Sequence, residues 1–471
     1  MTHAQPSASL AYVSRNAAVV LAAALLLSWV AFFNRAPLVF SDTIAYAAAA
    51  LEGEVPGLFS IYYSWFILPF HAGRTLWPVV IVQGVIVGHL LALSTRCVLG
   101  RRPNGLTILL IVAALCAFSS LPWLTGEILP DVFSPVLVLN TFLLGFCADR
   151  LSRGELIYIE GLTALAIAAH FSHVPLAAGL IVLCLVLRMI WSTPAVSGMR
   201  AALLLVIPLV AATAAIVGAN WMDSGRLVLA KNSNVFLLAK LLDEGPALRY
   251  LQRACPETHY ALCAYLDRLP GMSHDDLKWG GASPFNELGG FDAFEPEARH
   301  IVWGTVRTYP LELLRRAAID SGRQLLQFQT GDGLKPAFAR MVGDYLSDVF
   351  GPGIGVLLSQ SRQAQDDLRL PEFRAVHNAA LLVGAAFCLW SFVRYRREMN
   401  VRLRAFYLFV PGAIVCSAVV TGALSAPYDR YLARVIWVLV FLALLSIAWQ
   451  MQHRRRGART HAPSLDAATA T

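Results

Sequence analysis

The residues in this chain that could carry out chemistry are carboxylates, histidines and an arginine–tyrosine pair beside apolar segments. They are Asp42, Glu127, Asp131, His170, His173, Arg430 and Tyr431. A carboxylate can take up a proton, and arginine binds phosphate through paired hydrogen bonds. When the apolar segments are threaded through a membrane, all seven residues fall on the side that lacks the main arginine clusters. The pattern suggests chemistry at that membrane–water boundary.

Asp42 follows the first apolar segment, within the stretch 40–46. Ser41 or Asp42 is a good N-cap for a short helix that carries Tyr46 one turn further on. Two interpretations stay open: the Asp42 carboxylate only caps this helix, or it faces a cavity as a general base or metal ligand. The aromatic-rich segment 58–70 that follows is typical of an amphipathic segment at a membrane interface.

Glu127 and Asp131 form the second acidic feature. They are four residues apart, so a helical turn would place both carboxylates on one face, although Pro130 between them disturbs such a turn. Asp131 starts the fourth apolar segment and would complement the dipole of that helix. Glu127 has no comparable structural role in an otherwise uncharged loop, which favours a functional one.

The remaining candidates also have a structural alternative. His170 and His173 are three residues apart and share a helical face, so they could hold a metal or a phosphate, or be satisfied by hydrogen bonds at the interface. Arg430 lies on the side that is poor in arginine, next to Tyr431. It could bind a lipid phosphate or pyrophosphate, or form an ion pair with Asp429 or another carboxylate on that side.

The composition excludes an ordinary soluble protein. Of 471 residues, 57% are hydrophobic and 14% are charged, whereas charged residues make up about a quarter of soluble proteins. Apolar runs of roughly 16 to 25 residues recur, which suits helices that cross a hydrocarbon core of about 30 Å. Inside lipid each backbone polar group must be satisfied within its own segment, so these runs are predicted to be helices. The basic residues behind the formal charge of +8 lie in short loops, which argues against nucleic-acid binding.

The expected fold is an all-α polytopic membrane helix bundle with about ten spans. The predicted spans are 17–33, 75–95, 106–121, 132–147, 156–172, 175–190, 201–219, 377–393, 405–423 and 432–451. Arginines before the first span and in every second loop fall on one side if both termini are cytoplasmic, because positively charged loops resist translocation. The first span lacks a small-residue cleavage site and is predicted to be a retained anchor.

Four parts follow from these spans. We expect a seven-helix membrane core with interfacial helices in its first loop (1–219), a periplasmic helical domain (220–376), a three-helix membrane module (377–453) and a disordered cytoplasmic tail (454–471). The periplasmic region is long enough for a small domain, and its stretch 297–328 has apolar residues at helical spacing.

Cysteine placement agrees with this sidedness. Six of the eight cysteines lie in or beside apolar spans, where cysteine acts as a small hydrophobe. Cys255 and Cys263 lie in the predicted periplasmic region, where they can form a disulfide or remain two unpaired thiols. No second ligand pair follows them at zinc-finger spacing.

The layout resembles the GT-C class of integral-membrane glycosyltransferases, which use polyprenyl-phosphate-linked sugars. In that class an acidic residue follows the first span in a loop with membrane-parallel helices, as Asp42 does here with segments 45–51 and 58–70. A second acidic site after the third span is matched by Glu127 and Asp131, and an Arg-Tyr pair at the last span by Arg430 and Tyr431. This chain departs from the class in having a single Asp in the first loop and no soluble domain after the bundle.

The resemblance implies an enzyme of the bacterial inner membrane that transfers a sugar to an envelope glycan or lipid acceptor at the periplasmic face. Asp42 would be the base, and Glu127 or Asp131 would orient the acceptor or bind Mg²⁺ or Mn²⁺. Arg430 and a histidine would stabilise the leaving phosphate. Tyr46, His170, His173, Arg430 and Tyr431 would contact substrate.

Two other classes remain open for the same arrangement. A flippase or transporter for lipid-linked sugars would also place charged groups at a cavity, and a component of envelope polysaccharide assembly or polymerisation would also use this face. The chain has no phosphate-binding Gly-Lys-Ser loop, no Rossmann glycine pattern and no His-Glu-x-x-His motif, so work driven by ATP is not expected.

Overall fold

The computed structural model describes residues 8–100, 103–191 and 196–460, and these form an all-α bundle without a strand. Within them, seven stretches of helix are long and apolar enough to cross a membrane. They are α1 with α2 (Ala8–Leu27 and Trp29–Asn34), α5 (Trp77–Leu99), α10 (His173–Ile190), α11 (Gly198–Ser224), α20 (Leu370–Tyr395), α21 (Val401–Leu424) and α22 (Asp429–Thr460). The expectation of a polytopic helix bundle is confirmed.

The other three predicted spans are helices too, but they are shorter. They are α6 (Gly105–Phe118), α8 (Phe133–Phe146) and α9 (Arg153–Ala168). Helix α6 ends three residues before the predicted boundary, because the backbone is extended at Ser119 and then enters the short helix α7 (Leu121–Gly126). Every residue of α8 is buried. Since α8 is enclosed by other helices, it does not need the full length of a lipid-facing span.

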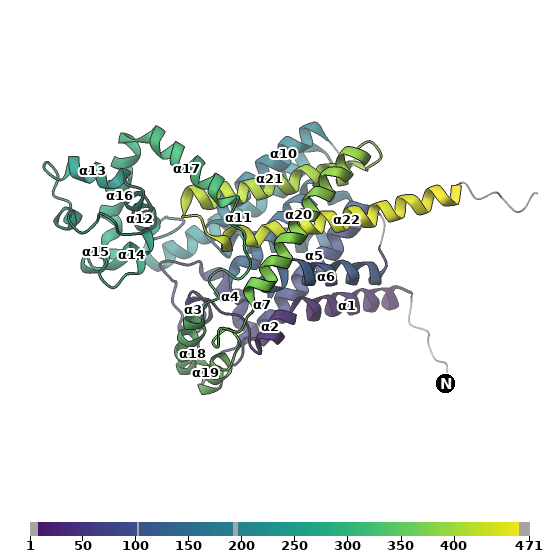
Figure 1. The fold of residues 1–471 in the computed structure, drawn as a ribbon, viewed down its shortest axis with the longest axis horizontal. Helices are drawn as coiled ribbons and strands as arrows, with labels where there is room; N and C mark the ends of the chain where they lie inside the picture. Colours follow the sequence, from purple (N-terminus) through teal and green to yellow (C-terminus); the bar gives the residue numbers. More distant parts are fainter. Residues whose placement is uncertain (1–7, 101–102, 192–195, 461–471) are drawn as a thin grey trace, which may run out of the picture.

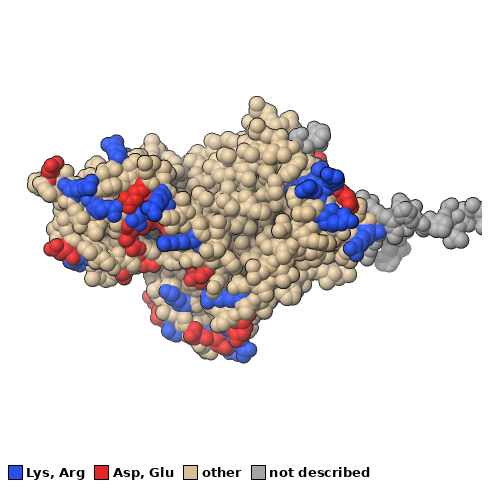
Figure 2. Space-filling view, turned by 45° about the horizontal axis from the view of Figure 1, so that its top comes forward, with Lys and Arg blue, Asp and Glu red and all other residues tan. Residues whose placement is uncertain are grey.

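The bundle has two different ends. Helix α1 begins and α22 ends at the same end, and the helices between α11 and α20 gather at the opposite end (Figure 1). Charged side chains collect at both ends, and the surface between them is nearly free of charge (Figure 2). An uncharged band of this kind is the expected exterior of a bundle surrounded by hydrocarbon.

The helices on either side of the predicted periplasmic domain are longer than their predicted spans. Helix α11 continues to Ser224 and α20 already begins at Leu370; the region between them, 225–369, is here called the extramembrane region. The expected disordered tail is wrong for 454–460, because α22 continues without a break to Thr460. Residues 461–471 of that predicted tail lie outside the described residues.

The extramembrane region contains two separately packed parts. The first part has its own apolar core, which runs from Val235 to Val302. Its helices are α12 (Ser233–Asp243), α13 (Pro246–Ala254), α14 (His274–Trp279), α15 (Pro284–Glu287) and α16 (Gly290–Thr308). The second part, α18 (Pro336–Phe350) and α19 (Pro352–Ser359), packs into the core of the membrane bundle through side chains such as Val342 and Leu358. The predicted single domain is thus divided.

Helix α17 (Pro310–Gln324) joins the first part to the bundle. It packs closely on the end of α21, where a Cβ added at Gly422 would lie 2.7 Å from Ser321 Cα. Lys240 Nζ ties the same place together, because it donates to Asp320 Oδ2 (2.9 Å) and to the carbonyl oxygens of Gly422 (3.0 Å) and Ser425 (2.7 Å). A buried cation thereby connects α12, α17 and the segment that leads into α22.

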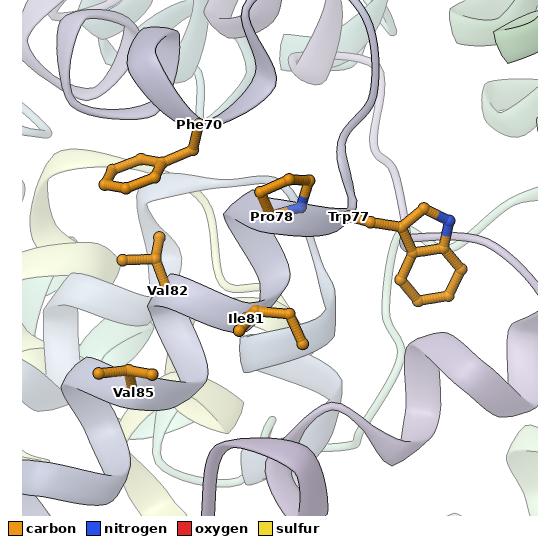
Figure 3. A pocket seen from close by; sticks show the side chains of 6 residues that line it. All are labelled: Phe70, Trp77, Pro78, Ile81, Val82 and Val85. Atoms are coloured by element: carbon orange, nitrogen blue, oxygen red, sulfur yellow. The ribbon is translucent and has the colours of Figure 1, made fainter. Parts of the chain in front are cut away.

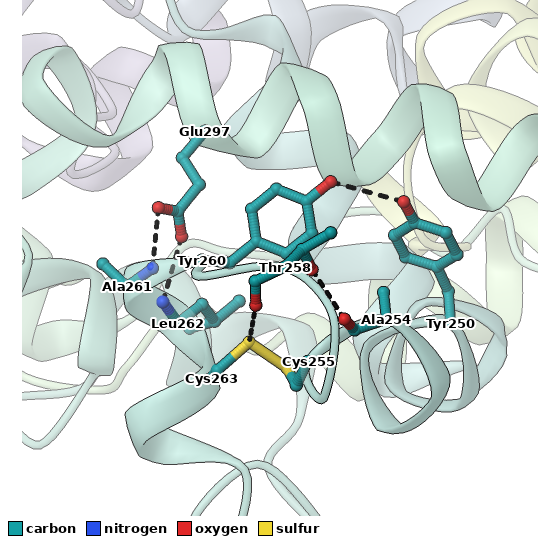
Figure 4. The surroundings of a disulfide bond; sticks show 9 residues. All are labelled: Tyr250, Ala254, Cys255, Thr258, Tyr260, Ala261, Leu262, Cys263 and Glu297. Atoms are coloured by element: carbon teal, nitrogen blue, oxygen red, sulfur yellow. Dashed lines mark hydrogen bonds between the residues drawn. A yellow bond between two sulfur atoms is a disulfide. The ribbon is translucent and has the colours of Figure 1, made fainter.

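A disulfide joins Cys255 and Cys263 (Figure 4). The Glu297 carboxylate of α16 accepts hydrogen bonds from the backbone N–H groups of Ala261 (2.8 Å) and Leu262 (2.9 Å), just before Cys263. The bridge and this carboxylate together hold a segment that contains little regular helix. Five of the other six cysteines are buried, and Cys416 is partly buried.

Candidate functional site

The loop that follows α2 and the loop that follows α7 lie side by side through backbone hydrogen bonds. The Leu38 N–H donates to the Gly126 carbonyl (2.9 Å), and the Ile128 N–H donates to the Leu38 carbonyl (3.0 Å). The Thr43 hydroxyl also donates to the Ile128 carbonyl (3.1 Å). This pairing brings the segment that carries Asp42 next to the segment that carries Glu127.

The buried side chains of Gln83 and Tyr63 stabilise the loop after α7 from the side of α5. Gln83 Nε2, from the middle of α5, donates to the carbonyl oxygens of Thr125 (3.1 Å) and Glu127 (3.0 Å). The Tyr63 hydroxyl of α4 (Ile61–His71) donates to Gln83 Oε1 (2.8 Å). Because buried carbonyl groups need a donor, these bonds explain how an irregular segment can lie inside the bundle.

Asp42 stands at the N-cap position of α3 (Thr43–Glu52), but its side chain makes no capping hydrogen bond. The interpretation of Asp42 as a capping side chain is therefore wrong. Its Oδ1 atom accepts a hydrogen bond from the Ser41 hydroxyl (3.0 Å). The half-buried site raises the pKa of the Asp42 carboxyl, and the charge of Arg430 partly opposes this effect. An accessible carboxylate of raised pKa is suited to accept a proton.

Asp131 forms the centre of a buried ionic cluster. Its Oδ2 atom lies 2.9 Å from Arg434 Nε and 3.7 Å from Arg430 Nε, and the Asp131 and Arg434 side chains are 4% and 3% exposed. Arg430 therefore pairs with Asp131 and not with Asp429, which accepts from the Gln329 N–H (2.8 Å). The suggested helix-dipole role of Asp131 is secondary to this ion pair.

The two guanidinium groups retain unused donors. Arg430 Nη1 and Arg434 Nη2 are buried and have no hydrogen-bond partner among the described residues. The Arg430 guanidinium lies over the Phe40 ring at 4.2 Å, which fixes its plane beside the Asp42 segment. Buried guanidinium donors without partners are costly unless an anion occupies the site.

Sequence reasoning missed Arg434. It lies one helical turn after Arg430, so both side chains leave α22 on the same face. The four-residue spacing from Arg430 is a signal in the sequence, although Arg434 lies within the predicted last span and not in a loop. The partner of Arg434, Asp131, lies in the 3₁₀ turn Pro130–Val132 that precedes α8, and this pairing was not readable from local sequence.

Glu127 is almost fully buried near the same cluster. Its exposed fraction is 7%, and its Oε1 atom has no hydrogen-bond partner among the described residues. Burial and then the neighbouring Asp131 charge raise the pKa of Glu127 to about 8. At neutral pH this carboxyl keeps its proton and can donate a hydrogen bond.

The two predicted tyrosines have different neighbours. The Tyr46 ring is buried one turn after Asp42, with ring centroids 5.1 Å from Phe59 and 5.2 Å from Tyr63. The Tyr431 ring lies near the Arg434 guanidinium (4.8 Å) and the Arg430 guanidinium (5.6 Å). Tyr431 is thus part of the cationic side of the site, and Tyr46 packs behind Asp42.

The two histidines, His170 and His173, have different surroundings. His173 Nδ1 donates to the Ala166 carbonyl (2.6 Å), so Nε2 accepts from the Ser134 hydroxyl (2.8 Å). Both ring nitrogens of His173 are satisfied, and the ligand interpretation fails for this residue. His170 Nδ1 accepts from the Ser172 N–H (3.1 Å), and burial lowers the pKa of His170 well below its usual range. A neutral His170 therefore presents an Nε2–H donor.

The donor set does not suit the Mg²⁺ or Mn²⁺ ion considered from sequence. In the ranges that the structure describes, no three His, Cys, Asp or Glu side chains are grouped so that they could hold a metal ion. Asp131 instead faces two guanidinium groups. Their positive charges oppose cation binding at this carboxylate.

Two hollows lie near these residues. A small one beside Arg434, Tyr431, Ser134 and His173 has a volume of about 10 Å³, which holds one water molecule at most. A wider groove of about 460 Å³ opens between α4 and α5, with wholly apolar walls formed by Phe70 and the first turns of α5 (Figure 3). Phe66 connects this groove with the site helix α8, since its ring lies 5.6 Å from Phe70 and 5.3 Å from Phe133.

The fold and the site define a multi-pass membrane protein with a buried cluster of carboxylates and arginines where the loops after α2 and α7 meet α22. No protein-family model, curated protein or solved structure matches this chain. Functional inference therefore depends on the geometry of the site.

Proposed function

We propose that this protein is a membrane glycosyltransferase that moves a sugar from a polyprenyl-phosphate donor to an envelope glycan or lipid acceptor. The observation that carries the proposal is the pair of buried guanidinium groups with unpaired Nη atoms, next to the half-buried Asp42 carboxylate. A phosphate would satisfy those donors. The resemblance to the GT-C class, stated for Asp42, Glu127, Asp131, Arg430 and Tyr431, agrees with this assignment.

In the proposed reaction, Asp42 takes the proton of the acceptor hydroxyl as that oxygen bonds to the sugar C1 atom. The bond between C1 and the phosphate oxygen breaks, and polyprenyl phosphate leaves with the electron pair. Arg430, Arg434 and the Nε2–H of His170 stabilise the leaving phosphate. Because Glu127 is neutral, it can orient an acceptor or donor hydroxyl by hydrogen bonding. The apolar groove at Phe70 and Val82 suits part of the hydrocarbon chain.

We also propose an orientation in the bacterial inner membrane, with both termini cytoplasmic and the site at the periplasmic face. The support is the excess of basic over acidic side chains at the end of the bundle where α22 ends, whereas the opposite end carries charges of both signs (Figure 2). The disulfide in the extramembrane region suits an oxidising compartment.

The test is transfer of label in reconstituted vesicles from polyprenyl phosphates that carry radiolabelled hexoses or pentoses, with an envelope extract as acceptor. We expect the Asp42→Asn variant to insert and fold but to lose about 10²- to 10⁴-fold in transfer rate. The matched control is Glu52→Gln, which alters another carboxylate of the same helix α3 and should keep full activity.

Three results would contradict the proposal or a part of it. Full transfer by Asp42→Asn would remove Asp42 from the role of base. Movement of intact lipid-linked sugar across the vesicle membrane, without a new glycosidic bond, would favour the flippase or transporter class. Transfer of the label only to a growing polysaccharide chain would favour the polymerase alternative.

A further inference from the structure

Helix α17 has the polarity of a lipid-facing helix, although it is too polar to be a span. Its buried side carries Asp320, Ser321 and Gln324, and Gln324 is fully enclosed. Its outward side carries large apolar residues, of which Leu311 is 79% and Leu314 is 67% exposed. A helix on a soluble domain shows the reverse arrangement, with apolar residues inside.

The exposed apolar residues follow one line along α17. Leu311, Leu314 and Ala318 are separated by three and four residues, which places them on one face of the helix, and Ile319 widens this stripe. The exposed Leu325 and Leu326, the two residues that follow α17, extend the stripe. The exposed Arg323 borders the stripe and the exposed Arg315 lies within it, and arginine side chains can reach from apolar surfaces to the headgroup level of a bilayer.

The stripe on α17 lies at the end of the uncharged band, beside the end of α21. The buried face of α17 packs on the last turn of α21 through Ser321 and Gly422. Gln324 continues the contact, since its side chain donates to the Tyr428 carbonyl (2.8 Å) and accepts from the Tyr428 N–H (3.0 Å). Leu424, the last residue of α21, is exposed as well. The stripe therefore continues the apolar exterior of a membrane-spanning helix.

We propose that α17 is an interfacial helix whose stripe (Leu311, Leu314, Ala318, Ile319, Leu325 and Leu326) lies in the lipid leaflet on the side of the extramembrane region. A position at the lipid interface explains why polar residues of α17 are buried and apolar residues are exposed. The buried polar residues are satisfied by Lys240 and by the Tyr428 backbone, and the exposed leucines are removed from water by acyl chains. A solvent-exposed position would leave this apolar surface unexplained.

The interfacial position of α17 does not depend on the proposed catalysis. Helix α17 nevertheless connects the lipid surface to the site, because it holds the segment 422–428 that leads directly into Arg430. A change in how α17 sits in lipid would move the backbone that enters the first turn of α22.

Site-directed spin labelling tests this arrangement. Leu311→Cys and Leu314→Cys are labelled with a nitroxide in the full-length protein, reconstituted in vesicles of phosphatidylcholine and phosphatidylglycerol. Collision rates with oxygen, which concentrates in lipid, are compared with those of a water-soluble nickel chelate. The unsubstituted protein gives the background, because five of its six free cysteines are buried and one is partly buried.

Two control positions calibrate the measurement. Leu382→Cys reports from the exposed middle of the span α20, and Arg299→Cys reports from the exposed surface of α16 in the extramembrane region. We expect labels at 311 and 314 to resemble the label at 382, with high oxygen and low nickel-chelate accessibility. Values that resemble those at 299 would overturn the proposal. Labels that neither reagent reaches would also overturn it, because a second copy of the chain would then cover the stripe.

Discussion

Asp131 Oδ2 lies 2.9 Å from Arg434 Nε at a place where both side chains are almost fully enclosed. This ion pair joins the 3₁₀ turn that precedes α8 to the second turn of α22, which are far apart in sequence. Arg430, one turn earlier, approaches the same oxygen. The cluster thus holds α22 against the loop after α7 and keeps Arg430 and Arg434 beside Asp42. Structure and proposed chemistry depend on the same contact.

Removing Arg434 is expected to destabilise the protein strongly. Arg434→Ala leaves the Asp131 carboxylate buried without its main partner, and breaking a buried pair in this way costs about 3–5 kcal/mol. The measurement is the free energy of unfolding in detergent. Asp131→Asn is the matched single variant, and the double variant should lose less than the sum of the two single losses. Simple additivity would show that the two side chains do not interact.

Glu127 is expected to make stability fall as pH rises. The folded protein keeps the Glu127 proton up to its raised pKa of about 8, whereas the unfolded chain releases it near the ordinary value of about 4.5. Between these values the unfolded state binds fewer protons, so stability decreases by at most about 1.4 kcal/mol per pH unit. Below and above this window the contribution is constant.

The check is the difference in unfolding midpoint between Glu127→Gln and the unsubstituted protein across that window. Glutamine cannot ionise, so the variant should gain relative stability as pH rises toward about 8. Glu52→Gln, on the exposed end of α3, serves as the control and should show no such trend. An equal difference for Glu127→Gln at all pH values would show that the carboxyl is ionised throughout.

Lys240 is expected to control the order of the segment before α22. Lys240→Met leaves the buried Asp320 carboxylate and the Gly422 and Ser425 carbonyl groups without their donor, and a loss of this kind costs about 3–5 kcal/mol when a buried pair is broken. Amide hydrogen exchange in 422–428 should then rise, and glycosyl transfer should fall with it. Arg249→Met, which removes an exposed ion pair with Glu312, should change neither. Unaltered exchange in Lys240→Met would contradict this role.

The disulfide is expected to stabilise the extramembrane region locally. It closes a loop with a sequence separation of 8, for which chain entropy predicts about 2–3 kcal/mol. Cys255→Ser with Cys263→Ser should therefore raise protease cleavage in 250–266, with the ionic cluster unaffected. Cys416→Ser, within a span, is the control. Protection equal to that of the unsubstituted protein would show that Glu297 holds this segment without the bridge.

Sequence alone was sufficient for the features that depend on local composition. The apolar runs predict helices because lipid offers no other partner for backbone groups, and the arginine-rich loops predict which ends lie together. It also identified Asp42, Glu127, Asp131 and Arg430 as candidates, since charged residues are rare beside apolar segments. These inferences need only the residues within one span and its flanks.

Tertiary structure decided everything that depends on partners from distant segments. It brought Arg434 to Asp131, satisfied both nitrogens of His173 and placed Glu127 where burial keeps its proton. It also turned the apolar side of α17 outward, although the spacing of its leucines alone would suit a packed core. Burial and charge at a site are sums over neighbours in space, and the order of residues along the chain does not specify those neighbours.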